Sequence, residues 1–171
     1  MSELAKLAES FAVEAHLTQV RKYTGRPYVE HVIAVSAIVA AYGGDENQIV
    51  AALLHDTVED TDTTLEQITE LFGPDVAKLV EELTNVYDKS AYPDMNRAER
   101  KRLEAIRLGS ISDRAQTIKY ADFLNNGEDI LVQDPKFAKV HLREMAHKLE
   151  LMTRGNPALR QHVITRVLGA I

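Results

Sequence analysis

The chain has 171 residues, 45% of them hydrophobic, a balance typical of one folded domain and unlike that of a disordered chain. It contains no cysteine, which excludes disulfides, thiolate metal sites and thiol catalysis. The net charge of -6 makes nucleic acid polymers unfavourable partners, although a small anionic ligand could bind where positive charge gathers locally.

No apolar run approaches the roughly 20 residues of a transmembrane helix, so no membrane partner is expected. The N-terminal stretch MSELAKLAES carries acidic side chains and lacks the apolar segment of a signal peptide, which leads us to expect a cytoplasmic protein. Because the sequence has no internal repeat and no long linker, we expect a single domain over residues 1–171.

Helical periodicity continues along nearly the whole chain and predicts an all-α fold. Gly43 and Gly44 end one helix, because glycine readily adopts the left-handed conformation, and Asp45 can cap the next. The predicted helices cover 2–23, 28–43, 46–58, 62–73, 74–84, 97–108, 113–126, 135–154 and 157–168. The longest expected loop is 86–96. These elements predict a bundle of about eight to ten helices.

Two histidines lie at matching distances from the predicted turn at Gly43 and Gly44. His31 lies twelve residues before Gly43, and His55 lies eleven residues after Gly44. If the two helices fold back antiparallel, both side chains lie about 17–18 Å from the turn, because an α-helix rises by ~1.5 Å per residue. Two residues that are distant in the sequence are thereby brought to the same height.

Asp56 and Asp122 complete a set of nitrogen and oxygen ligands. Asp56 follows His55 directly, and neighbours on a helix point about 100° apart, so the pair can approach one metal ion from two sides. Asp122 is flanked by apolar residues, where an ionised carboxylate is costly unless it is paired or metal-bound. With His31, these residues predict a site for one divalent ion, which suits Mn²⁺ and would accept Fe²⁺, Zn²⁺ or Mg²⁺. Such an ion, with open positions, would support hydrolysis of a phosphate ester.

Glu59, Asp60 and Asn126 each lie four residues after a predicted ligand and so face the same side of the helix, one turn on. A carboxylate in that position can orient a water or take its proton, which makes Glu59 and Asp60 candidate catalytic residues. Asn126 could hydrogen-bond a substrate. Taken singly, each residue also has a structural explanation as a cap, a core side chain or an arginine partner. The other histidines, at positions 16, 141, 147 and 162, lack such partners and are expected in the core or on the surface.

Basic residues gather in two stretches of this acidic chain. The later stretch contains Arg97, Arg100, Lys101, Arg102, Arg107, Arg114 and Lys119. A solvated helix face with salt bridges between successive turns explains about half of these. Arg21 and Lys22 precede the His31 helix, and phosphate groups favour charge-assisted hydrogen bonds from such side chains. We therefore expect Arg21 and Lys22 to contact an anionic substrate.

Four stretches of the chain carry a family resemblance: 21–31 (RKYTGRPYVEH), 52–61 (ALLHDTVEDT), 72–73 (FG) and 118–126 (IKYADFLNN). In order and spacing they resemble the HD-domain hydrolases of the RelA/SpoT type, above all the stand-alone small alarmone hydrolases. The resemblance covers most of residues 11–130. It implies an Mn²⁺-dependent enzyme that removes the 3′-pyrophosphate of ppGpp or pppGpp, giving GDP or GTP and pyrophosphate.

The resemblance also implies a role for each candidate residue. By position, the family's metal ligands match His31, His55, Asp56 and Asp122. The family's water-activating acidic pair matches Glu59 and Asp60. Its basic residues near the nucleotide match Arg21 and Lys22, and a polar site residue matches Asn126. The chain departs from the long relatives at Phe123 and Asn125, where they often have Arg and His, and in a turn after Lys22 that looks about one residue longer.

Because these departures border the pocket, the substrate stays open at this point. An adenine alarmone, NADPH or another nucleotide is an alternative substrate for the same metal chemistry. A non-catalytic binding protein or antitoxin is an alternative of another class. The expected partner is a small anionic nucleotide, and a second copy of the chain or a paired alarmone synthetase is a further candidate.

Overall fold

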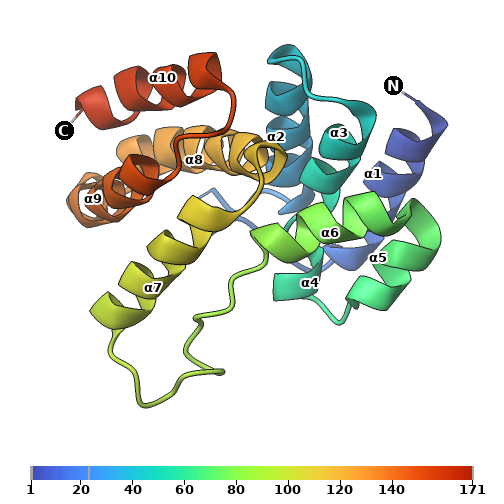
Figure 1. Ribbon diagram of the computed structural model, residues 1–171, viewed down its shortest axis with the longest axis horizontal. Helices are drawn as coiled ribbons and strands as arrows, with labels where there is room; N and C mark the ends of the chain where they lie inside the picture. Colours follow the sequence, from blue (N-terminus) through green and yellow to red (C-terminus); the bar gives the residue numbers. More distant parts are fainter. Residues whose placement is uncertain (1, 23, 171) are drawn as a thin grey trace.

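The computed structural model describes residues 2–22 and 24–170, and within them every regular element is helical (Figure 1). The elements are α1 (Glu3–Ala15), α2 (Val29–Ala41), α3 (Glu46–Leu54), α4 (Thr57–Asp60), α5 (Leu65–Phe72), α6 (Pro74–Leu83), α7 (Arg97–Ser110), α8 (Asp113–Gln133), α9 (Pro135–Leu151), α10 (Pro157–Arg166) and the 3₁₀-helix η1 (Leu168–Ala170). The described residues contain no strand, only an isolated bridge between Val20 and Pro27. The predicted all-α bundle is confirmed.

Local sequence signals explain how the helices start and turn. Asp45 forms a capping box at the start of α3, because its carboxylate accepts from the N–H of Gln48 while the Gln48 side chain accepts from the N–H of Asp45. Gly43 ends the α2 segment at a φ of 78°, a left-handed conformation that favours glycine. A Cβ on Gly44 would lie 2.4 Å from Val39 Cγ1, so the turn also needs a residue without a side chain there.

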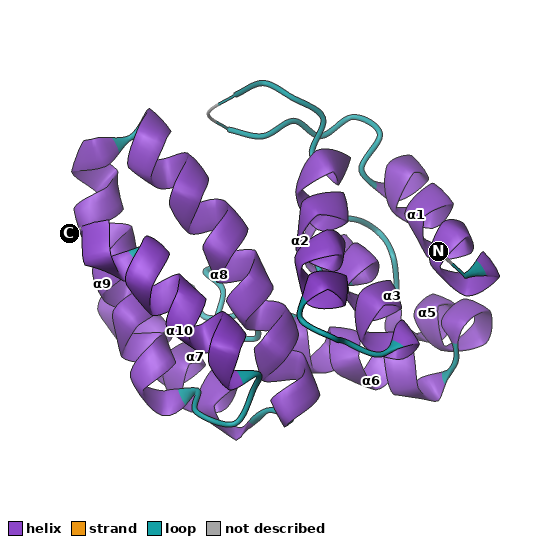
Figure 2. Cartoon of the chain, turned by 90° about the horizontal axis from the view of Figure 1, so that it is seen from above, coloured by secondary structure: helices purple, strands orange, loops and turns teal. Residues whose placement is uncertain are grey.

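The helices form two groups that meet at α2 and α8. Figure 2 shows α1, α3, α5 and α6 on one side and α7, α9 and α10 on the other. Helix α3 contacts α1, α2, α6 and α8, and its residues Ala51 to Leu54 are at most 1% exposed. Helix α8 contacts α2 as well as α9 and α10, so α2 and α8 join the two groups. In the described part of the chain, no helix combines the length and apolar character that crossing a membrane requires.

The first helix is shorter than the sequence predicted. Helix α1 ends at Ala15, whereas periodicity predicted a helix to Tyr23, a residue that lies outside the described part of the chain. Val20, which lies within the range predicted as helical, is 61% exposed. The backbone instead folds back on itself, because the N–H of Tyr28 donates to the carbonyl oxygen of Gln19 at 3.0 Å. This return of the chain outcompetes helix propensity, which is weak on its own.

The helix predicted over 46–58 is interrupted at His55 and Asp56. Helix α3 ends at Leu54 and α4 begins at Thr57. Nδ1 of His55 donates to the carbonyl oxygen of Ala52 at 2.8 Å, and the Thr57 hydroxyl donates to that of Leu54 at 2.7 Å. These side chains occupy carbonyls that the next helical turn would use, and such local bonds compete with a regular helix.

Helix α8 extends further than predicted. The predicted helix ended at residue 126, just before Gly127, but α8 continues to Gln133. Gly127 is buried, and a Cβ there would lie 2.4 Å from Val167 Cγ1. The glycine therefore allows the end of the chain to approach α8 closely and does not act as a helix stop.

Candidate metal centre

Three side chains from distant parts of the sequence converge at the junction of α2, α3 and α8. His31, His55 and Asp122 each offer one ligand atom, and these atoms lie within 4.8 Å of one another. The two imidazole rings are 5.4 Å apart between centroids, as the antiparallel arrangement of the two helices predicted. Nε2 of His31 lies 3.2 Å from Oδ1 of Asp122. Asp56 borders the group, with Oδ2 3.0 Å from Nε2 of His55.

Hydrogen bonds to the far side of each ring leave Nε2 available as a ligand. Nδ1 of His31 donates to Oδ1 of Asn125 at 2.7 Å, and Nδ1 of His55 donates to the carbonyl oxygen of Ala52. Both acceptors are oxygens without a hydrogen, so each Nδ1 carries a proton, and in the neutral ring the lone pair lies on Nε2. Both Nε2 atoms are buried, and neither has a hydrogen-bond partner among the residues that the structure describes. Such outer bonds orient histidine ligands in metal sites.

The two carboxylates are also held from behind. The Tyr28 hydroxyl donates to Oδ2 of Asp56 at 2.6 Å. The Lys119 ammonium lies 2.8 Å from Oδ2 of Asp122, while the Asn126 amide donates to Oδ1 of the same carboxylate at 2.6 Å. Each aspartate is therefore fixed in orientation by a neighbour that stabilises its ionised form.

The charges in this group favour ionised carboxylates. Burial alone would raise the pKa of Asp122, but Lys119 and the two histidines hold it well below its usual range. Burial would likewise raise the pKa of Asp56, and His55 outweighs that effect and lowers it. Burial would lower the pKa of His55, yet Asp56 and Asp122 raise it to about 9. The two ionised carboxylates therefore favour a positive charge beside them, either on a histidine ring or on a bound cation.

The geometry fits one divalent cation. Metal–nitrogen and metal–oxygen bonds of about 2.0–2.2 Å place neighbouring ligand atoms about 3 Å apart and opposite ones about 4 Å apart. The distances from the histidine Nε2 atoms to the carboxylate oxygens of Asp56 and Asp122 range from 3.0 to 3.9 Å, which matches that spacing. The donor set of imidazole and carboxylate suits a first-row transition ion or Mg²⁺.

Glu59 and Asp60 lie on α4, one turn beyond the interruption, and both keep contact with solvent. Partial burial raises the pKa of Glu59, whose Oε2 accepts from the N–H of Asn85 at 3.0 Å. Partial burial, together with the negative charges of Asp56 and Glu59, raises the pKa of Asp60 to about 6. Asp60 can therefore exchange a proton close to neutral pH.

Of the predicted substrate contacts, Arg21 and Asn126 are linked to the metal group, whereas Lys22 lies against α9. Arg21 donates to Oδ1 of Asn125 and to Oδ1 of Asn126, both at 3.3 Å, and lies 2.5 Å from Oδ2 of Asp129. It is thus linked to His31 through one shared partner, Asn125. The Lys22 ammonium lies 5.7 Å from the centre of the Phe137 ring on α9. The Asn126 amide is engaged with Asp122, so its predicted contact with a substrate would have to share that bond.

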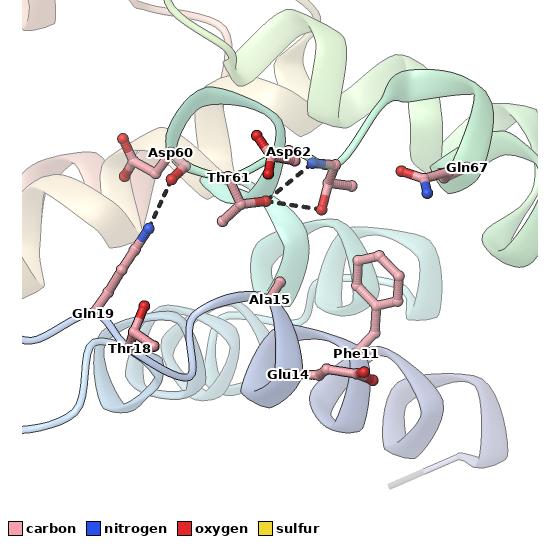
Figure 3. Close-up of a pocket in the computed structure, with 10 residues that line it drawn as sticks. Phe11, Glu14, Ala15, Thr18, Gln19, Asp60, Thr61, Asp62 and Gln67 are labelled. Carbon is pink, nitrogen blue, oxygen red and sulfur yellow. Dashed lines mark hydrogen bonds between the residues drawn. The ribbon is translucent and has the colours of Figure 1, made fainter.

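Two of the larger cavities border the site. One of about 370 Å³ is lined by Arg21, Asn125 and His31, and His31 is the one predicted ligand among its lining residues. Another of about 490 Å³ lies between the end of α1 and the turn after α4 (Figure 3). Asp60 lines this larger cavity, but none of the four predicted ligands does. Of these two cavities, the smaller one alone includes a predicted ligand among its lining residues.

Sequence reasoning missed three residues that shape this site. Tyr28 precedes His31 by three residues and Lys119 precedes Asp122 by three, a spacing that places each pair on one helix face. Asn125 was noted only as a departure from the long relatives, although it follows Asp122 by the same spacing. The ion pair with Lys119 also helps to stabilise buried Asp122, for which the sequence argument favoured a metal over pairing with a basic side chain.

Comparison with known proteins identifies similar chains. A family profile described as an HD domain matches residues 8–147. The chain is 47% identical over 128 residues to guanosine-3′,5′-bis(diphosphate) 3′-pyrophosphohydrolase MESH1 of Drosophila melanogaster. The matched stretch covers 73% of this chain and 68% of that protein. It is 43% identical over 134 residues to human MESH1, and this match covers 75% of the chain and 72% of human MESH1. A solved structure of a metazoan SpoT ortholog, described as hydrolysing ppGpp, has a TM-score of 0.86 at 36% identity and covers 100% of this chain and 98% of that one.

Proposed function

Because the chain belongs to the HD-domain family, we propose that it hydrolyses the 3′-pyrophosphate of the alarmone ppGpp or pppGpp, giving GDP or GTP and pyrophosphate. The observation that carries this proposal is the buried group of His31, His55 and Asp122, whose ligand atoms lie within 4.8 Å of one another. The relatives named as ppGpp pyrophosphohydrolases support the choice of substrate.

In this proposal, His31, His55, Asp56 and Asp122 hold one divalent ion, and Mn²⁺ is the ion we propose. An ion in that position supplies Lewis-acid stabilisation of the phosphoryl oxygen. The surrounding bonds from Tyr28, Asn125 and Lys119 would keep the ligands in place when charge builds up.

Release of an intact pyrophosphate requires water to attack the phosphorus atom that is joined to the 3′ oxygen. The attacking water loses a proton, and the departing 3′ oxygen gains one. We assign the first transfer to Asp60, because a carboxylate with a pKa of about 6 can accept a proton and is still ionised at neutral pH. Glu59, held by the N–H of Asn85, would orient the water.

Arg21, Lys22 and Asn126 are the proposed substrate contacts. Arg21 lines the cavity beside His31, and it also lines a third, smaller cavity of about 140 Å³ with Lys22 and Asn126. The basic side chains would offset the charge of a polyphosphate substrate in an otherwise acidic chain. A cytoplasmic location, a single domain over residues 1–171, and a second copy or a paired alarmone synthetase as partner also stay predictions from the sequence.

Incubation of the protein with Mn²⁺ and ppGpp, followed by separation of the nucleotides, tests the proposal. We expect GDP and pyrophosphate, and none from the His55→Ala, Asp56→Ala double variant. Pyrophosphate release no greater than that of the double variant would refute hydrolysis of ppGpp. If the double variant nevertheless protected a toxic partner protein, a binding function would replace the enzymatic one.

A panel of nucleotides then tests the base preference. The panel contains ppGpp, pppGpp, an adenine alarmone and NADPH at equal concentrations. We expect the highest kcat/KM for the guanine alarmones, since relative kcat/KM reports preference for the transition state. A higher value for NADPH or the adenine alarmone would keep the metal chemistry and overturn the assigned substrate.

A further inference from the structure

The backbone of Asp60 is held by a side chain from a distant part of the chain. Nε2 of Gln19 donates to the carbonyl oxygen of Asp60 at 2.7 Å. Figure 3 shows the Gln19 side chain reaching across from the segment after α1 to this carbonyl. Because Asp60 is the last residue of α4, this bond fixes the point at which the chain leaves the helix.

A second side chain determines which way the Gln19 amide points. Nδ1 of His16 lies 2.8 Å from Oε1 of Gln19, and since an amide oxygen only accepts, Nδ1 is the donor. This bond turns the oxygen of the amide toward His16 and its NH₂ group toward Asp60. If the amide flipped, its oxygen would face the carbonyl oxygen of Asp60, and the two acceptors would repel each other.

The imidazole of His16 is not explained by packing alone. The residue is 2% exposed, and within the described part of the chain its buried Nε2 has no hydrogen-bond partner. A buried polar atom without a partner destabilises the fold, so an apolar ring of similar size would suit this position better for stability. The bond to Gln19 is the one hydrogen bond found for the ring among the described residues.

The same segment also reaches the other end of the interrupted helix. The His16 ring lies 5.0 Å from the ring of Tyr28, whose hydroxyl donates to Asp56. The residues between α1 and α2 thus contact both Asp56 and Asp60, the first through Tyr28 and the second through Gln19. They set the position of the proposed proton acceptor relative to the predicted metal ligand.

We propose that His16 is a positioning residue for the hydrolytic reaction, acting through Gln19 to place Asp60. This inference rests on the proposed function, in which Asp60 takes the proton of the attacking water. His16 touches neither the predicted metal ligands nor the acidic side chains through a hydrogen bond. Its effect is expected on kcat and not on binding of the ion or the substrate.

Two variants of His16 separate positioning from packing. His16→Phe keeps a ring against Tyr28 and removes the donor to Gln19. His16→Asn loses the ring and keeps an N–H close to the position of Nδ1. We expect His16→Phe to lower kcat for ppGpp by about 10–100-fold, with KM and Mn²⁺ affinity within about twofold and thermal stability unchanged or raised. His16→Asn should lower thermal stability and keep kcat within about threefold.

A third variant, Gln19→Glu, keeps the size and the acceptor of the side chain and removes the N–H that reaches Asp60. It should lower kcat as His16→Phe does. Wild-type kcat in His16→Phe, or a kcat that falls in step with melting temperature across the three variants, would refute the positioning role.

Crystal structures of His16→Phe and His16→Asn test the inference independently of activity. We expect the Asp60 carbonyl to move away from Gln19 in the first variant and to stay in place in the second. If Asp60 stays in place in His16→Phe, the positioning role is wrong even where the wild type hydrolyses ppGpp. If Asp60 moves while the wild type is inactive on every nucleotide tested, the positioning of Asp60 holds and the proposed function alone fails.

Discussion

Replacement of Lys148 by methionine should stabilise the fold at neutral pH. Lys148 lies on α9 with its ammonium 5.5 Å from the centre of the Phe123 ring. Burial, followed by the positive charges of Lys119 and Lys101, lowers the pKa of Lys148 from 10.5 to about 8. At about 1.4 kcal/mol per pKa unit, this shift means that charged Lys148 lowers the free energy of unfolding by about 3 kcal/mol.

The net gain from Lys148→Met should be smaller than that figure. The side chain keeps some contact with solvent, and the substitution also removes its contact with the Phe123 ring. We therefore expect a gain of about 1–2 kcal/mol at pH 7. Methionine keeps the unbranched stem, so packing should change little.

The pH dependence of the gain provides the test. Below about pH 8 the lysine is charged in both the folded and the unfolded chain, and its full destabilising effect is present. Between about 8 and 10.5 the unfolded chain binds more protons than the folded one, so wild-type stability rises with pH and the advantage of the variant declines.

Urea denaturation followed by circular dichroism at pH 7, 9 and 10.5 measures this effect, at pH values chosen from the ordinary and lowered pKa of Lys148. Lys139→Met is a matched control, because Lys139 is an exposed lysine on the same helix. The control should change stability by less than about 0.5 kcal/mol at each pH. Equal stability of Lys148→Met and wild type at pH 7, or a gain that does not depend on pH, would refute the reasoning.

Three further predictions concern the metal group, the packing of α8 and the proposed base. Tyr28→Phe removes the hydroxyl that donates to Asp56 and should weaken Mn²⁺ binding by about 10–100-fold in a calorimetric titration, whereas unchanged affinity would exclude this supporting role. Gly127→Ala should lower the free energy of unfolding by about 1–3 kcal/mol, because its Cβ would lie 2.4 Å from Val167 Cγ1. Combining it with Val167→Ala should cost less than the sum of the two single changes in urea denaturation; strict additivity would mean that the clash is not the cause. Because Asp60 must be ionised to accept a proton, kcat should rise with pH through a value at or below its pKa of about 6, since a bound cation would lower that pKa. The same rise in Asp60→Asn would assign it to another group.

Periodicity was sufficient to predict the helical class and most of the elements, because an apolar stripe must face a core wherever a helix packs. It failed where side chains compete for backbone groups. His55 and Thr57 take carbonyl oxygens of α3 and break a continuous apolar pattern. At Gly127 the predicted helix was too short, because this glycine allows close packing against Val167 and does not end the helix. Neither effect is visible without the neighbouring elements.

The candidate site shows the same limit. Counting residues from Gly43 and Gly44 was enough to bring His31 and His55 to one height, since two antiparallel helices have a fixed rise per residue. Tyr28 and Asn125, which orient ligands, were not predicted, because each bonds to a ligand from a distant part of the sequence. Lys119 acts within α8, and its spacing from Asp122 could have indicated it. Asn125 accepts a hydrogen bond from His31 on another helix, and the sequence around these two residues gives no signal that they are in contact.

The crowding of functional side chains on one face of α8 limits where the chain can change in length. Lys119, Asp122, Asn125 and Asn126 all contact the metal group or residues that support it. One residue inserted among them would rotate every later position by about 100° and separate the set in a single step. An insertion in the loop between α6 and α7 would leave that register intact. Homologous chains should therefore accumulate insertions and deletions in that loop while the spacing from Lys119 to Asn126 stays constant.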